Sequence, residues 1–272
     1  KKGTPLPRDP ETVGQADLVL LEATYGDRAH RDRAATVTEI GDVLDRAWAD
    51  GGNLLIPAFA VGRTQEVLYW FARYWDRWNM DRWKIFLDSP MASKVTEVYD
   101  RHESLFDSKA REIWRGQPHP FRLPNLRYTE SVEESRGINA HERGAIIIAG
   151  SGMCNGGRIR HHLRQNLGRR QAHVMFVGYQ SRGTLGRRLV DGAPRVKLFG
   201  EDIQVNAQRH TVGGLSAHAD QPGLLDWYAG FANKPPVVLV HGEDPAREAL
   251  AGKLREHGSH VDLARPGMER EV

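Results

Sequence analysis

The sequence predicts an α/β fold built on a largely parallel sheet. Short apolar runs alternate along the chain with longer segments whose apolar residues recur at helical spacing. Three runs, LLIPAF (54–59), AIIIA (145–149) and VVLV (237–240), are continuously apolar, which is typical of parallel strands covered on both faces. Alternating strands and helices form βαβ units, so this pattern indicates the fold class.

The elements follow in order from DLVLLEATY, whose apolar run predicts a buried strand over 17–25. Val37, Ile40 and Leu44 then recur at helical spacing and predict a helix over 36–50, which a glycine pair ends. The same criteria predict further strands over 53–60, 84–90, 145–153, 173–180, 237–243 and 260–266. They predict further helices over 63–75, 91–102, 104–114, 157–167, 220–231 and 245–258. A proline-rich loop at 117–125 and a hairpin at 196–208 complete the set.

The composition is that of an ordinary globular chain. Its 272 residues suffice for one large core or two domains. The sequence contains no run of eighteen apolar residues, so it predicts no membrane-spanning helix. Residues 1–11 lack the apolar centre of a secretory signal. The single cysteine, Cys154, excludes an internal disulfide and a cysteine-rich zinc site, and it favours the reducing cytoplasm. A net charge of +3 permits an anionic partner.

Two glycine-rich turns and one basic segment are candidate phosphate contacts. The turns at 150–158 and 178–188 each lead into a helix, where backbone N–H groups can bind an anion. Neither matches a nucleotide-binding motif. Residues 158–173 contain five arginines and no acid, which indicates either a phosphate-facing surface or a solvated helix face.

Polar residues follow five of the predicted strands. These residues are Glu22; Asp88 and Ser89; Ser151 and Gly152; Tyr179 and Gln180; and His241 and Glu243. Each alone is commonly a turn or cap residue. Because ligands of open α/β sheets bind beyond the carboxyl ends of the strands, five such ends together predict a site there.

The segment GGLSAHADQ (213–221) carries His218 between small residues, with Asp220 two positions later. In one interpretation Ser216 or Asp220 caps the following helix and His218 is an ordinary loop residue. In the other, His218 is a general acid or a phosphate-binding imidazole with an acidic partner.

Other histidines and the tryptophans have simpler interpretations. His161 and His162 are adjacent in a helix and must point in different directions, while His210 is expected in a polar surface context. Trp70, Trp75, Trp78 and Trp83 are candidates for base stacking, but core packing is favoured.

Seven blocks in order resemble the β-CASP group of metallo-β-lactamase-fold nucleases, which includes the endonuclease of the cleavage and polyadenylation machinery. The blocks are LLEATYGDR, LIPAFAVGRTQE, FLDSPMA, IIIAGSGMCNGGRIRHHL, MFVGYQSRGTLGR, GLSAHADQ and LVHGE. The resemblance implies a β-CASP domain over 27–214. It also implies that 1–26 and 215–272 are parts of a metallo-β-lactamase αββα fold.

The resemblance also implies site residues. Glu22 matches the acid of the first family motif, His218 matches a histidine that approaches the scissile phosphate, and His241 matches a ligand of one of two zinc ions. A histidine at this last position is typical of members that act on RNA. The expected contacts to single-stranded RNA are Ser151, Gly152, Arg158, Arg160, Arg182 and Ser216.

One departure from the family pattern concerns the metal. The HxHxDH motif that supplies most zinc ligands does not occur, and the bridging aspartate of relatives would precede Lys1. We therefore expect this chain to be the C-terminal two-thirds of a zinc-dependent ribonuclease and to be inactive alone. Whether that ribonuclease is an endonuclease or an exonuclease is left open. A non-catalytic RNA-binding scaffold subunit remains an alternative, as does a DNA-processing nuclease, which His241 disfavours. A homodimer is left open.

Overall fold

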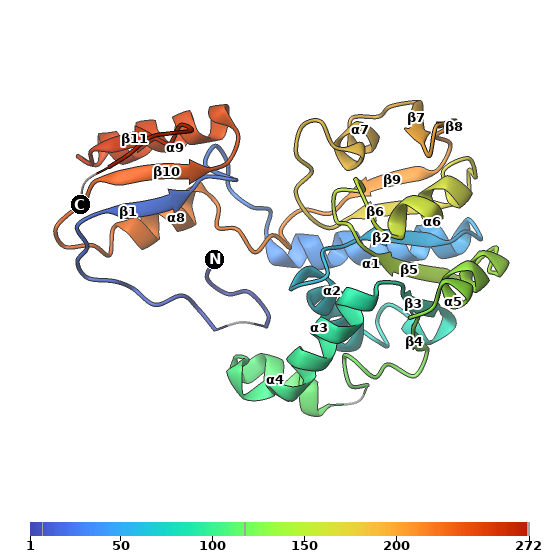
Figure 1. Cartoon of the computed structure of the whole chain (residues 1–272). Coiled ribbons are helices and arrows are strands. Elements are labelled where there is room, and N and C mark those ends of the chain that lie inside the picture. Colours follow the sequence, from blue (N-terminus) through green and yellow to red (C-terminus); the bar gives the residue numbers. More distant parts are fainter. Residues whose placement is uncertain (7, 117, 271–272) are drawn as a thin grey trace. The chain divides into compact units, whose positions relative to one another are not determined.

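The strands of the computed structural model form two parallel sheets and one hairpin (Figure 1). The structure describes residues 1–6, 8–116 and 118–270. It divides into a smaller unit, made of Lys1–Arg31 and the segment from Ala217 onward, and a larger unit over Asp32–Ser216. None of the helices within the described ranges is long and apolar enough to cross a membrane.

The larger unit carries a six-stranded sheet in the order β4-β3-β5-β2-β6-β9, in which every neighbouring pair is parallel. Its strands are β2 (Leu54–Pro57), β3 (Lys84–Leu87), β4 (Leu126–Tyr128), β5 (Ala145–Ala149), β6 (His173–Phe176) and β9 (Gln208–Thr211). The antiparallel hairpin joins β7 (Arg195–Leu198) to β8 (Glu201–Gln204). The predictions of a largely parallel α/β fold and of this hairpin are therefore confirmed.

Helices cover both faces of this sheet. The helices are α1 (Arg33–Ala49), α2 (Arg63–Arg73), α3 (Pro90–Arg101), α4 (Ser108–Arg115), α5 (Val132–Gly137), α6 (Ile159–Asn166) and α7 (Leu185–Val190), with 3-10 turns η1 (Met80–Arg82), η2 (Glu103–Leu105) and η3 (Ile138–Ala140). On one face, Leu55 joins a buried cluster with Ile159 and Leu163 of α6 and Leu189 of α7. Leu54, which points to the opposite face, is fully buried as well.

The smaller unit carries a three-stranded parallel sheet in the order β1-β10-β11. Its elements are β1 (Val19–Glu22), α8 (Gln221–Tyr228), β10 (Val237–His241), α9 (Asp244–Glu256) and β11 (Val261–Leu263). Leu21, Leu239 and Leu250 are buried in one cluster between the strands and the helices. Leu20 and Val240 are 65% and 46% exposed, so the described residues cover the second face of this sheet only in part. The apolar run VVLV predicts a strand buried on both faces of the sheet, and this prediction is wrong for Val240.

Among the strands and α-helices of the described residues, the sequence did not predict β4, β9, α5 and α7. Strands β4 and β9 are the two edges of the large sheet, and neither contains a fully buried residue. An edge strand pairs on one side only and carries polar side chains, so the apolar-run criterion does not detect it.

The tryptophan prediction is confirmed for three of four residues, because Trp70, Trp78 and Trp83 are 2%, 3% and 1% exposed. His210 has a polar context, as expected, but it is half-buried and not on the open surface. Its Nε2 lies 2.9 Å from Nδ1 of His173, a fully buried residue whose Nε2 lies 3.0 Å from an Asp50 carboxylate oxygen. The three side chains form a hydrogen-bonded chain within the larger unit.

Candidate metal and catalytic site

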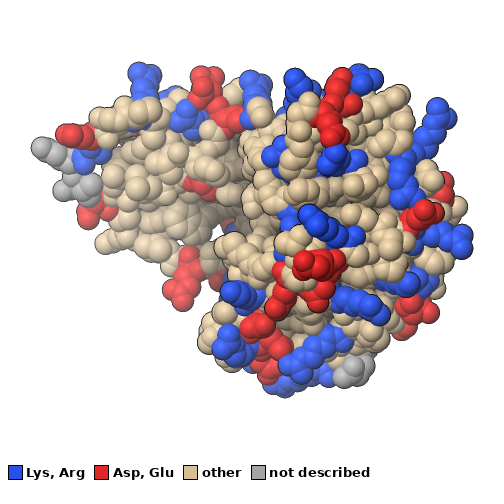
Figure 2. Space-filling view, turned by 45° about the vertical axis from the view of Figure 1, so that its right-hand side comes forward, with Lys and Arg blue, Asp and Glu red and all other residues tan. Residues whose placement is uncertain are grey.

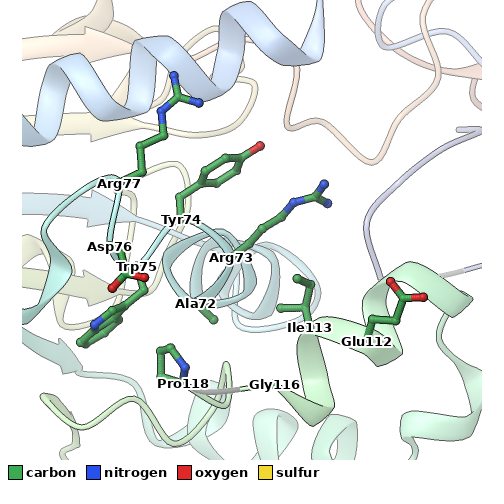
Figure 3. Close-up of a pocket in the computed structure, with 10 residues that line it drawn as sticks. All are labelled: Ala72, Arg73, Tyr74, Trp75, Asp76, Arg77, Glu112, Ile113, Gly116 and Pro118. Atoms are coloured by element: carbon green, nitrogen blue, oxygen red, sulfur yellow. The ribbon is translucent and has the colours of Figure 1, made fainter.

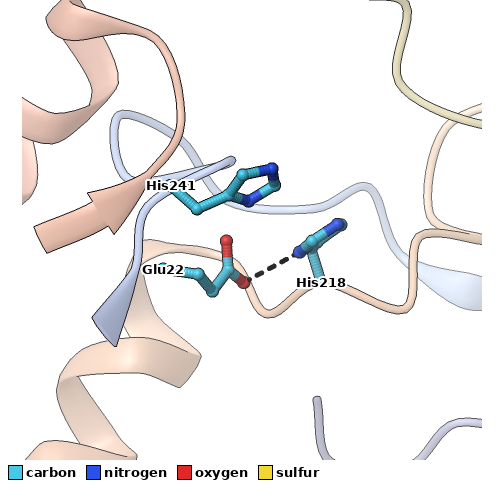
Figure 4. Close-up of side chains that lie close together, drawn as sticks. All are labelled: Glu22, His218 and His241. Atoms are coloured by element: carbon cyan, nitrogen blue, oxygen red, sulfur yellow. Dashed lines mark ion pairs between the residues drawn. The ribbon is translucent and has the colours of Figure 1, made fainter. Parts of the chain in front are cut away.

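The carboxyl ends of β1 and β10 bring an acid and a histidine side by side. Glu22 is the last residue of β1 and His241 the last of β10, and the two are partners in the parallel register. Parallel strands end at the same edge of their sheet, which accounts for the proximity of two residues so distant in sequence. His218 reaches the same place from the loop that precedes α8 (Figure 4).

The three side chains form a tight cluster. One ligand atom from each of Glu22, His218 and His241 lies within 4.8 Å of the other two. The two imidazole rings are stacked, with centroids 5.4 Å apart and planes 29° apart. No other group of three His, Cys, Asp or Glu side chains in the described parts of the chain is gathered this closely.

Hydrogen bonds orient the cluster. Nδ1 of His218 lies 3.2 Å from Oε1 of Glu22, and Oε2 of Glu22 accepts the backbone N–H of Thr24 at 2.7 Å. The Thr24 hydroxyl lies 3.0 Å from Nδ1 of His241 and 3.4 Å from Nδ1 of His218. Sequence reasoning missed Thr24. Its position two residues after Glu22 was the available signal, since it follows the strand end within the same motif block.

The carboxyl group of Glu22 is ionised at neutral pH. Burial raises its pKa, but hydrogen bonds from His218 and from Thr24 have a larger combined effect, and the pKa falls to about 2. The charged carboxylate is thus available either as a metal ligand or as a hydrogen-bond acceptor for an imidazole.

The donor set suits zinc. Zinc binds imidazole nitrogen and carboxylate oxygen, and catalytic zinc sites commonly combine three protein ligands with one open position. From the sequence, only His241 is expected to be a metal ligand. In the structure, ligand atoms of Glu22 and His218 lie within 4.8 Å of it and of each other. The residues present therefore fit a zinc ion.

The residues expected to contact RNA all lie in the larger unit. Ser151 and Gly152 follow β5 in a turn. Two hydrogen bonds close it: the Ser151 N–H donates to the Gly156 carbonyl, and the Gly156 N–H donates to the Ser151 hydroxyl. Gly152 has no room for a side chain, because a Cβ there would lie 2.8 Å from the Phe59 ring. Arg182 is exposed, and Ser216 is 7% exposed.

The arginine-rich helix α6 makes internal contacts. Arg158 donates to Asp88 at 2.7 Å and to the Glu130 carbonyl at 2.7 Å. Arg160 lies over the Phe199 ring, 4.7 Å from its centroid, and Arg164 donates to Glu201 at 3.0 Å. On the face shown in Figure 2, basic and acidic side chains are interspersed and do not form one continuous basic patch.

Asp88 is the centre of a buried polar network. It is fully buried and, besides Arg158, accepts hydrogen bonds from Thr129, Ser135 and His162, each at 2.6 Å. Burial raises its pKa, but these bonds together hold the pKa well below its usual range. His162 thus points inward, while His161 is exposed and stacks on Phe199, in agreement with the expectation that they face different ways.

A separate pocket of the larger unit lies between the end of α2 and the end of α4 (Figure 3). The guanidinium groups of Arg73 and Arg77 lie 5.8 and 5.7 Å from the centre of the Tyr74 ring. Asp76 and Glu112 also line the pocket, so two positive charges are matched by two negative ones. It therefore offers no net charge for a phosphate, and it holds no histidine or cysteine for a metal.

Two family models match the chain. The Beta-Casp domain matches residues 64–189, a range that includes Asp88 and the glycine turns. The Zn-dependent metallo-hydrolase RNA specificity domain matches residues 202–264, a range that includes His218 and His241.

Curated relatives agree with these matches. Ribonuclease TTHA0252 of Thermus thermophilus is 42% identical over 259 residues, which cover 95% of this chain and 59% of that protein. Transcription termination factor FttA of Pyrococcus abyssi is 31% identical over 236 residues, which cover 84% of this chain and 36% of that protein. The FttA of Methanocaldococcus jannaschii is 27% identical over 237 residues, 84% of this chain and 37% of that protein. The chain thus spans less than two thirds of the length of these relatives.

Proposed function

Because this chain belongs to the β-CASP family of metallo-β-lactamase-fold proteins, we propose that the protein hydrolyses single-stranded RNA with zinc as its cofactor. The observation that carries the proposal is the pairing of Glu22 with His218 beside His241, at one edge of a small parallel sheet. Clusters of an ionised carboxylate with two imidazoles are typical of functional sites, where titratable groups are brought together. The proposal concerns the whole protein.

His241 is the residue we assign to zinc. The Thr24 hydroxyl lies within hydrogen-bond distance of Nδ1, which leaves Nε2 as the nitrogen that coordinates. A zinc ion bound there would polarise phosphate oxygens and lower the pKa of water.

His218 is the residue we assign to proton transfer. Its Nδ1–H donates to Glu22, so Nε2 is the nitrogen we assign to the substrate, and a protonated Nε2 can donate to the oxygen that leaves phosphorus. The carboxylate of Glu22 orients the imidazole, as a carboxylate does in hydrolytic triads. Glu22 thus fixes the tautomer and the direction of the His218 ring.

We assign phosphate contacts to the glycine turn of Ser151 and Gly152, to the side chains of Arg160 and Arg182, and to Ser216. Arg158 belongs to the same group, and its bonds to Asp88 and to the Glu130 carbonyl support a role in shaping the turn. Backbone N–H groups of such turns bind phosphate oxygens without regard to sequence.

Two further properties complete the proposal. Burial raises the pKa of the Cys154 thiol to about 12, so the thiol stays protonated. A single free cysteine of this kind is compatible with the reducing cytoplasm, which we propose as the location. A homodimer is the quaternary state to test, by light scattering of the purified protein.

The deciding experiment measures zinc and cleavage together on the purified full-length protein. Metal analysis should find zinc, and an end-labelled single-stranded RNA should be cut in a reaction that a chelator stops. The same sequence as DNA should be cut more slowly. The His218→Ala variant serves as the control for contaminating ribonuclease. Equal cleavage by wild type and this variant would refute the proposal.

A further inference from the structure

The loop that carries His218 has no regular secondary structure, so other segments must hold it in place. Residues 212–219 contain no helix or strand. The chain that follows β1 supplies the contacts. Tyr25 forms a β-bridge with Asp220, and Gln221 donates from its backbone to the Arg28 carbonyl at 3.1 Å and from its side chain to the Gly26 carbonyl at 2.6 Å. The position of the loop thus depends on the segment over residues 25–30.

His30 ends this segment and contacts the loop twice. Its backbone N–H donates to Oδ2 of Asp220 at 2.9 Å. Its Nε2 lies 2.9 Å from the backbone carbonyl oxygen of His218. A carbonyl oxygen can only accept, so Nε2 of His30 carries the proton in this bond. The ring also packs on Tyr25, with centroids 4.5 Å apart, and this packing limits its rotation.

We propose that His30 is a positioning residue that aims the imidazole of His218 at Glu22. The bond to the His218 carbonyl fixes the peptide plane that follows His218. The second bond fixes Asp220, whose other oxygen caps α8 through Gly223 at 3.1 Å. With both points held, the Cα–Cβ direction of His218 is set, and Nδ1 comes to lie 3.2 Å from Oε1 of Glu22. This inference depends on the proposed function in one respect: it takes His218 to act on the substrate.

The geometry separates this role from catalysis itself. The side chain of His30 donates to a backbone carbonyl and packs on the Tyr25 ring in a tilted arrangement, so its effect on the reaction passes through His218. Loss of the imidazole should therefore slow the chemical step and leave substrate binding intact. The expected loss in kcat is about 10–100-fold, the range found when a group that orients a functional side chain is removed.

Three variants and a control test the proposal on the full-length protein. His30→Ala removes the donor. His30→Gln retains one, because the Gln amide nitrogen reaches about as far as Nε2 of histidine. His30→Asn keeps a polar group that is too short to reach the carbonyl, and it repeats the test should the alanine variant not fold. His260→Ala removes an exposed histidine of the same unit and serves as the control.

The first measurement does not depend on activity. In protein labelled with ¹⁵N-histidine, long-range nitrogen–proton correlations report the hydrogen-bonded Nδ1–H of His218, which is assigned by its loss in His218→Ala. We expect this signal to disappear in His30→Ala and His30→Asn and to persist in His30→Gln and His260→Ala. Its persistence in His30→Ala would overturn the proposal.

The second measurement compares kcat and KM for RNA cleavage. We expect a lower kcat with unchanged KM and zinc content in His30→Ala, and recovery of most of the rate in His30→Gln. Equal loss in the Ala and Gln variants, or loss of zinc and of cooperative unfolding in both, would show a purely structural role. A wild-type protein that does not cleave RNA would refute the proposed function, while the nitrogen spectra would still decide the role of His30.

Discussion

Thr24 and His241 are 217 positions apart in the chain, and the Thr24 hydroxyl lies 3.0 Å from Nδ1 of His241. Thr24 is 7% exposed, so solvent does not readily replace this contact. The hydroxyl fixes the orientation of the ring, and a metal ligand of fixed orientation binds more tightly than a free one.

The first prediction concerns this contact. Thr24→Val keeps the shape of the side chain and removes its hydroxyl, so we expect zinc affinity to fall about 10–100-fold. A titration with a competing chelator measures the affinity. Thr24→Ser retains the hydroxyl and should stay close to wild type. Equal affinities for the valine and serine variants would contradict the prediction.

The second prediction separates the two histidines of the site. His218→Ala should keep zinc and lower the cleavage rate by about 10²–10⁴-fold, the usual range for general acid–base catalysis. His241→Ala should lower zinc occupancy, because it removes a ligand. Glu22→Gln should resemble a milder loss of His218. Metal analysis beside the cleavage rate tests all three variants. Loss of zinc in His218→Ala would make His218 a ligand, which the closeness of all three side chains also permits.

The third prediction concerns the buried network around Asp88. Asp88→Asn removes the charge that pairs with Arg158 and His162 while both partners remain in place. Breaking a buried ion pair on one side costs about 3–5 kcal/mol of unfolding free energy, so we expect a loss of this order in urea denaturation. Asp191→Asn removes an exposed partner of Arg187 and should change the unfolding free energy by less than about 1 kcal/mol.

The same network has a defined acid dependence. The pKa of Asp88 is lower in the folded protein than in the unfolded chain, so the unfolded state binds the proton first. The stabilisation by Asp88 is therefore fully present above the unfolded pKa of about 3.9 and is lost as pH falls below it. Asp88→Asn should flatten this part of the curve of stability against pH. An unchanged slope below pH 4 in the variant would contradict the prediction.

The fourth prediction concerns His210. Burial lowers its pKa to about 4, with further lowering by His173 and Arg46, and Asp50 opposes the shift. Between pH 6.5 and 4 the unfolded chain binds this proton and the folded protein does not, so stability should fall as pH falls through this range. The expected loss between pH 7 and pH 5 is on the order of 1 kcal/mol, measured by urea denaturation at both values.

His210→Gln should abolish this part of the pH dependence because glutamine does not titrate. The matched control is His161→Gln, which removes an exposed histidine of the same unit. Retention of the full pH dependence by the His210 variant would show that another group is responsible.

The fifth prediction concerns RNA binding. If Arg160 and Arg182 each contact a phosphate, alanine at either position should reduce the slope of log affinity against log salt by about 1 unit. Fluorescence anisotropy of a labelled single-stranded RNA over a salt series measures the slope. Arg195→Ala removes an arginine that pairs with Asp202 and is the control. Slopes equal to wild type in both test variants would exclude these arginines from the RNA surface.

The predicted helices and the central strands were found because their signal is local. In α1 the buried residues Val37, Ile40 and Leu44 follow the helical period, and all five residues of β5 are buried as its apolar run indicates. The edge strand β9 was missed for the opposite reason. Its sequence QRHT is mostly exposed, so its strand conformation comes from pairing with β6 and not from its own composition.

The sequence by itself determined the α/β class and the order of most elements, and its family resemblance predicted Glu22, His218 and His241 as site residues, which the structure brings close together. The class and the order of the elements depend on periodicity, which a single stretch of chain displays, and the site residues depend on short motifs shared with the family. Only the tertiary structure decided which side chains orient them. Thr24 and His30 contact histidines 217 and 188 positions away. A hydrogen bond requires two atoms within about 3 Å, and only the folded chain brings such distant segments that close.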